Sequence, residues 1–152
     1  MIKGVEFEYL KCHKDFRGYF TEILRLNNPI VKEGVGQLSH SLVYFGVTKA
    51  WHAHKVQTQW NYVINGVIYV ALHDARKDSD TFGETITFLT GDNHKKLIYK
   101  FPPGILHGYR CVNGPMNILY ITSGTYDLDD EIRVPYDDKN INFDWHNINP
   151  II

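Results

Sequence analysis

The 152-residue chain lacks the features that mark several other classes of protein. Its only cysteines are Cys12 and Cys111, too few for a disulfide-rich scaffold, and we expect both to be free thiols. No segment comes near the roughly 18 uncharged residues of a membrane-spanning helix. The formal net charge of -1 provides no basic field for nucleic acid. The sequence therefore predicts a cytoplasmic protein with neither a membrane nor a nucleic acid as its partner.

Long helical patterns are also missing, and apolar residues instead occur in short runs rich in β-branched and aromatic side chains. Residues 37–44 alternate between apolar and polar positions, which predicts a half-buried strand whose polar face, with Gln37, could line a cavity. The pair Asn65-Gly66 separates runs at 60–64 and 67–72 and predicts a tight β-hairpin. Further strands are expected at residues 85–89, 96–101, 107–112 and 116–122.

The regular spacing of these strands predicts one all-β domain over residues 1–152, either a sandwich or a barrel. An acidic, turn-rich segment follows at residues 127–138 and leads to Phe143 and Trp145. We expect this carboxyl-terminal segment to pack on the barrel rather than to form a second domain.

Three histidines give the clearest chemical signal. His52 and His54 lie two residues apart in a strand-like segment, so their side chains share one face. His107 follows a Pro-Pro-Gly corner, where a small barrel would direct a third imidazole into the same cavity. An imidazole titrates near neutral pH, which makes His52 a natural general base.

The spacing of these histidines resembles the cupin family of double-stranded β-helix, or jelly-roll, barrels. The first cupin motif is matched by Gly46, His52, His54, Gln59 and Gly66, and the second by Pro102 or Pro103, Gly104 and His107. Gln59 replaces the acidic metal ligand that is usual in the first motif.

A narrower resemblance covers residues 15 to 145. Segments at 15–22, 49–52, 78–83, 103–109, 136–138 and 144–145, together with Tyr120 and Tyr126, resemble the dTDP-4-dehydrorhamnose 3,5-epimerase family. The resemblance implies a homodimeric, cofactor-independent jelly roll that acts on a dTDP-linked or other nucleotide-linked 4-keto-6-deoxy sugar. It further implies epimerisation by proton abstraction next to the ketone.

The resemblance also implies roles for individual residues. His52 matches the base, Asp138 the carboxylate that orients it, and Tyr126 the acid that returns a proton to the opposite face. Arg17 would contact the diphosphate, while Phe20 and Glu22 would approach the nucleotide base from the other subunit. The remaining residues predicted to bind substrate are Gln37, Lys49, His54, Gln59 and His107.

Two departures from the family keep other functions open. Gln59 stands where the family has a lysine near the enolate oxygen, so Lys49 or Lys55 would have to supply a cation. The run from His52 to Lys55 also resembles the sugar 3,4-ketoisomerases. Further alternatives are a non-catalytic nucleotide-sugar-binding protein and a metal-dependent cupin enzyme with His52, His54, Gln59 and His107 as ligands.

Overall fold

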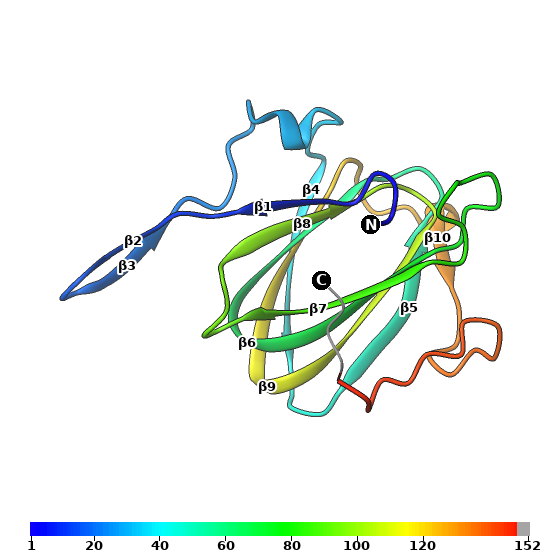
Figure 1. The fold of residues 1–152 in the computed structure, drawn as a ribbon. Helices are drawn as coiled ribbons and strands as arrows, with labels where there is room; N and C mark the ends of the chain where they lie inside the picture. The colour runs from blue at the N-terminus through cyan, green and yellow to red at the C-terminus, as the bar shows by residue number, and fades with distance from the viewer. Residues whose placement is uncertain (149–152) are drawn as a thin grey trace.

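Two long antiparallel strands, β6 (Gln59–Asp74) and β9 (Ile105–Thr122), run side by side through the body of the protein (Figure 1). The computed structural model describes residues 1–148. The other strands are β1 (Glu6–Tyr9), β2 (Cys12–Asp15), β3 (Gly18–Thr21), β4 (Gln37–Val43), β5 (Thr48–His54), β7 (Thr85–Gly91), β8 (Leu97–Phe101) and β10 (Glu131–Arg133). Two short 3-10 helices, η1 (Pro29–Val31) and η2 (Leu128–Asp130), complete the described elements. Among residues 1–148, no helix has the length and apolar character needed to span a membrane.

The strands form the curved antiparallel sheet expected of a jelly roll. Its order is β1-β8-β6-β9-β5-β10, with β4 added to β9 and β7 added to β6. Strands β2 and β3 pair only with each other among the described elements, and this hairpin extends away from the barrel (Figure 1). The all-β architecture predicted from the short apolar runs is confirmed.

The hairpin predicted at Asn65-Gly66 is wrong. The chain continues through both residues within β6, and Gly66 has a φ of 78° inside an irregular register between Val63 and Ile68. Gly66 therefore has the positive φ expected of a turn, but it lies in a β-bulge instead. The two halves of β6 have different second neighbours, β8 and β7, and the bulge lets one strand bend from one to the other. Strand β9 likewise continues through residues 113–115, where two separate strands were expected.

The carboxyl-terminal segment packs against the barrel, as the sequence predicts. Trp145 is buried, and its ring centroid lies 4.8 Å from that of Trp51 on β5. Phe143 makes an edge-to-face contact with Trp51 at 5.5 Å. These aromatic contacts fix the chain that follows β10, and β10 itself pairs with β5.

Strand β4 has the predicted alternation, with an unexpected exposure on one side. Gln37 and Ser39 line a cavity, which confirms the expectation for the polar face. The opposite face carries Leu38 and Leu42, which are 63% and 49% exposed in the single chain. An apolar strand face left in solvent is typical of a surface that another protein covers.

Candidate active site

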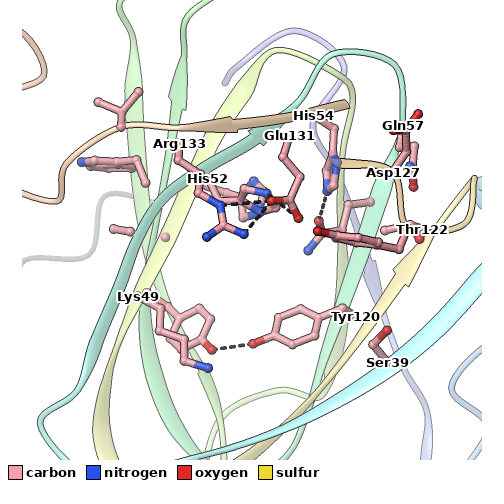
Figure 2. A pocket seen from close by; sticks show the side chains of 18 of the residues that line it. Ser39, Lys49, His52, His54, Gln57, Tyr120, Thr122, Asp127, Glu131 and Arg133 are labelled. Atoms are coloured by element: carbon pink, nitrogen blue, oxygen red, sulfur yellow. Dashed lines mark hydrogen bonds and ion pairs between the residues drawn. The ribbon is translucent and has the colours of Figure 1, made fainter. Parts of the chain in front are cut away.

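A cavity of about 590 Å³ opens inside the barrel between β5, β9 and β10 (Figure 2). Polar and aromatic side chains from five strands and from the segment before η2 reach it. Its lining includes Gln37, Ser39, Lys49, His52, His54, Gln57, Gln59, His107, Tyr109, Tyr120, Thr122, Tyr126, Asp127, Glu131 and Arg133. A cavity of this size with a few polar groups fits a small organic ligand.

His52 lies at the centre of the β5 part of this wall. Its ring centroid is 4.8 Å from that of His54 and 5.1 Å from that of His107, which is opposite His52 in the β5–β9 register. Burial lowers the pKa of His52, and the neighbouring His54 lowers it further, while Glu131 opposes the shift. The ring is therefore neutral near pH 7 and able to accept a proton.

A carboxylate and a guanidinium on β10 face His52. The Nε2 atom of His52 is buried without a hydrogen-bond partner, and the Oε1 atom of Glu131 lies 3.7 Å from it. Arg133 is opposite His52 in the β5–β10 register. Its Nε and Nη2 atoms both donate to the Oε2 atom of Glu131, at 3.0 and 2.6 Å (Figure 2).

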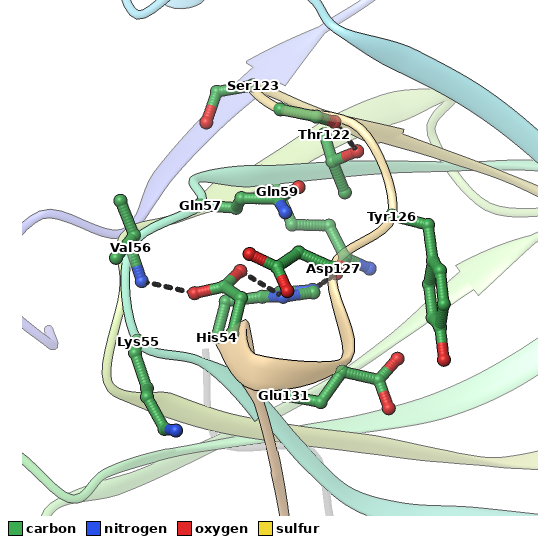
Figure 3. A network of polar contacts seen from close by, with 12 residues as sticks. His54, Lys55, Val56, Gln57, Gln59, Thr122, Ser123, Tyr126, Asp127 and Glu131 are labelled. Atoms are coloured by element: carbon green, nitrogen blue, oxygen red, sulfur yellow. Dashed lines mark hydrogen bonds and ion pairs between the residues drawn. The ribbon is translucent and has the colours of Figure 1, made fainter.

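His54 is held by a buried polar network (Figure 3). Its Nδ1 atom lies 2.9 Å from the Oδ2 atom of Asp130, and its Nε2 atom lies 2.9 Å from the Oε1 atom of Gln59. Gln59 in turn donates to Asn61 at 2.8 Å. Asp130 also accepts the backbone N–H of Val56 at 2.6 Å. Both ring nitrogens of His54 are thus engaged, which fixes the ring plane beside His52.

These contacts bear on the alternative metal ligands His52, His54, Gln59 and His107. His54 and Gln59 would each have to give up a hydrogen bond to bind a metal ion. Within residues 1–148, no group of three or more His, Cys, Asp or Glu side chains is arranged to hold a metal.

Tyr120 and Lys49 lie across the cavity from His52 (Figure 2), and Tyr109 lines the same cavity. The hydroxyls of Tyr109 and Tyr120 are 2.5 Å apart. Burial raises the pKa of each phenol. Lys49 projects toward the same part of the cavity (Figure 2). Because both phenols stay protonated, this side can donate hydrogen bonds to a negative charge that develops on a bound ligand.

Most of the side chains predicted to bind substrate or to act in catalysis come together in this cavity. Seven line it: His52, Tyr126, Gln37, Lys49, His54, Gln59 and His107. Tyr126 lies at the rim with 66% of its surface exposed, and its backbone N–H donates to Gln37. Lys55 is outside the lining, and its ammonium group donates to the carbonyl of Asp129.

Four predicted residues lie elsewhere. Asp138 does not line the cavity, because its Oδ1 atom accepts the backbone N–H groups of Asn140 and Ile141 in a turn. The carboxylate beside His52 is instead that of Glu131. The other three belong to the projecting hairpin and the residues just after it: Arg17, Phe20 and Glu22.

The sequence prediction missed Glu131, Arg133, Tyr109 and Tyr120 as cavity residues. Alternation in the strand 131–133 puts Glu131 and Arg133 on one face, a signal that was present but only three residues long. The contact between Tyr109 and Tyr120 joins two parts of β9 that bend toward each other. No local sequence pattern predicts such a bend.

Comparison with known proteins identifies the family of the chain. The family model for dTDP-4-dehydrorhamnose 3,5-epimerase matches residues 1–152. The chain is 40% identical to the spore coat polysaccharide biosynthesis protein SpsL of Bacillus subtilis over 149 residues, which are 96% of this chain and 97% of that protein. It is 32% identical to the probable low-salt glycan biosynthesis epimerase Agl13 of Haloferax volcanii, over 95% of each chain.

A solved structure agrees with this assignment. The dTDP sugar isomerase of Desulfovibrio desulfuricans G20 superposes with a TM-score of 0.89 at 25% identity, covering 98% of this chain and 95% of that one. The chain therefore belongs to the dTDP-4-dehydrorhamnose 3,5-epimerase family and has its jelly-roll fold.

Proposed function

We propose that the protein epimerises a nucleotide-linked 4-keto-6-deoxyhexose, with His52 removing a proton from a carbon next to the ketone. The observation that carries the proposal is a neutral, partly buried imidazole with a carboxylate beside it and phenols and an ammonium group across the cavity. Several relatives are named as dTDP-4-dehydrorhamnose 3,5-epimerases. As a member of that family, the protein is an isomerase that works without a cofactor.

The chemistry requires a base, a group that stabilises the enolate oxygen, and an acid. The ketone acidifies the neighbouring C–H bond, so its proton passes to His52 while the electron pair moves onto the ketone oxygen. Lys49 is the cation that we assign to this oxygen, because Lys55 is tied to Asp129 outside the cavity. Return of a proton to the opposite face of the carbon inverts its configuration.

Tyr120 and Tyr126 are the two candidates for the acid. The resemblance points to Tyr126, but that side chain lies mainly in solvent. Tyr120 lies across the cavity from His52, and its hydroxyl contacts that of Tyr109. We favour Tyr120 on geometry and assign Tyr126 to the sugar or nucleotide at the rim. Tyr120→Phe should then remove epimerisation while Tyr126→Phe mainly weakens binding.

Incorporation of solvent deuterium tests the proposal directly. The wild-type protein, incubated in D₂O with dTDP-4-keto-6-deoxyglucose, should introduce deuterium at carbon 3, carbon 5 or both. His52→Asn should abolish exchange, and His94→Asn, an exposed histidine outside the cavity, serves as the matched control. A product with the carbonyl at carbon 3 would identify a 3,4-ketoisomerase. Tight binding without exchange would identify a binding protein and overturn the proposal.

We also propose that the protein works as a cytoplasmic homodimer. The projecting β2–β3 hairpin carries Phe16 and Phe20, which are 97% and 66% exposed, and the outer face of β4 exposes Leu38. A second copy would cover such apolar surfaces. Arg17, Phe20 and Glu22 would then reach the nucleotide in the partner's cavity rather than in their own.

A further inference from the structure

We propose that Glu131, held in place by Arg133, is the carboxylate that positions His52 for proton abstraction. This inference rests on the proposed function for the reaction that His52 performs. It gives Glu131 the role that the family resemblance assigns to Asp138, and it gives Arg133 a role that the sequence did not suggest. Glu131 is a positioning residue, because it acts through His52.

The two oxygen atoms of Glu131 have different environments. Arg133 contacts only Oε2, through two of its nitrogen atoms. Oε1 is the atom that lies 3.7 Å from His52 Nε2. The guanidinium therefore restricts the rotation of the carboxylate and leaves one oxygen directed at the imidazole. The Glu131 side chain is 12% exposed, that of His52 32% and that of Arg133 74%, so water screens the contact between Glu131 and His52 only in part.

The Nε2 atom of His52 has no hydrogen-bond partner, and a nearby carboxylate oxygen is the kind of acceptor that it needs. A buried ring nitrogen without a hydrogen bond is rare in native proteins and calls for an explanation. At 3.7 Å the contact with Glu131 is an ion-pair distance rather than a hydrogen bond. Catalytic hydrogen bonds are often long without substrate and shorten in the complex. A small movement of either side chain would close this one.

The proton inventory is consistent with this arrangement. In the arrangement that we propose, neutral His52 carries its hydrogen on Nε2, which faces Glu131, and the other ring nitrogen, Nδ1, is left to accept the proton. The carbon-bound proton moves to Nδ1 and the C–H electron pair becomes the enolate, so the ring becomes an imidazolium. Glu131 Oε1 then faces a positive charge and stabilises it without taking the proton.

Groups on several elements act on the charge of His52, and Glu131 and Arg133 act in opposite directions. The facing groups are His54 on β5, His107 on β9, Glu131 and Arg133 on β10, and Asp130 at the end of η2. Glu131 and Asp130 raise the pKa of His52, whereas His54 and Arg133 lower it. Removing each charge on β10 should therefore move the titration of His52 in a predictable sense.

NMR titration of the His52 ring tests the assignment without using activity. Glu131→Gln should lower the pKa of His52 by roughly one pH unit, and Arg133→Gln should raise it. Glu84→Gln removes an exposed carboxylate outside the cavity and should leave the titration unchanged. Identical His52 titrations in wild type and Glu131→Gln would overturn the proposal. So would a larger shift in Asp138→Asn than in Glu131→Gln.

Deuterium exchange kinetics provide the second measurement. Glu131→Gln should lower kcat for exchange on the order of 100-fold, the lower end of what a positioned acid–base group contributes, with little change in KM, and Glu131→Asp should restore part of the loss. A larger loss in Asp138→Asn than in Glu131→Gln would return the role to Asp138 and overturn the proposal. If wild-type protein shows no exchange, the proposed function fails, and the NMR titration still decides whether Glu131 is coupled to His52.

Discussion

His107 is enclosed by aromatic and imidazole rings, and we expect this burial to lower the stability of the protein in acid. Its ring centroid lies 4.4 Å from that of Phe101, and burial lowers its pKa well below 6.5. The unfolded chain binds a proton near pH 6.5, whereas folded His107 stays neutral. The unfolded state therefore binds more protons below that pH, so the free energy of unfolding falls as pH falls.

We expect this loss to reach at most about 1.4 kcal/mol per pH unit for His107 below pH 6.5. Urea unfolding at several pH values between 5 and 8 measures it. His107→Gln should flatten the dependence, and a remaining slope would come from His52 and His73, whose pKa values burial also lowers. If the unfolding free energy of His107→Gln depends on pH as steeply as that of the wild type, His107 is not the cause of the acid sensitivity.

The three imidazoles were predictable because alternation in a strand fixes which side chains share a face. His52 and His54 follow that rule, and the Pro-Pro-Gly corner places His107. The carboxylate was not predictable in the same way. Asp138 was chosen by resemblance, but its Oδ1 atom accepts backbone N–H groups of its own turn. Short acidic side chains often form such local hydrogen bonds to the backbone.

Strand β6 shows why a turn signal can mislead. Asn-Gly needs positive φ in a hairpin, and Gly66 does have it, but at a bulge. The Asn-Gly pair correctly predicts that the backbone has a positive φ at Gly66. The pair cannot predict that β9 continues alongside both halves of β6, because that pairing involves residues about fifty positions away. Tertiary pairing therefore decides between a turn and a bend.

Gly66→Ala tests the bulge. A Cβ at Gly66 would lie 2.7 Å from the Cβ of Met116 and 2.8 Å from the carbonyl oxygen of Asn113. Gly34 has a similar φ, 83° against 78°, but a Cβ added there would meet nothing within 4 Å. Gly34→Ala should cost about 1 kcal/mol of unfolding free energy from backbone strain, and Gly66→Ala at least about 2 kcal/mol more from overpacking. Equal losses in urea unfolding would argue against the close approach of β6 and β9.

The barrel and the projecting hairpin together determine how two copies could share one active site. The cavity is lined by residues of one chain, while Arg17 lies on the hairpin, 76% exposed and paired with Asp15. An exposed arginine on an extended arm is suited to a phosphate that belongs to a ligand in another chain. The same arm contributes nothing to the cavity of its own chain among the described lining residues.

Mixing two inactive variants distinguishes these arrangements. Arg17→Ala leaves the cavity intact but removes the guanidinium that would contact the phosphate. His52→Asn leaves the hairpin intact but removes the base. In a mixed dimer, one site combines wild-type His52 with a wild-type Arg17 from the partner. A 1:1 mixture that exchanges subunits should therefore recover about one quarter of the wild-type deuterium exchange. If native mass spectrometry shows mixed dimers but deuterium exchange stays at the level of the separate variants, each hairpin serves its own chain, because no complete site would then form.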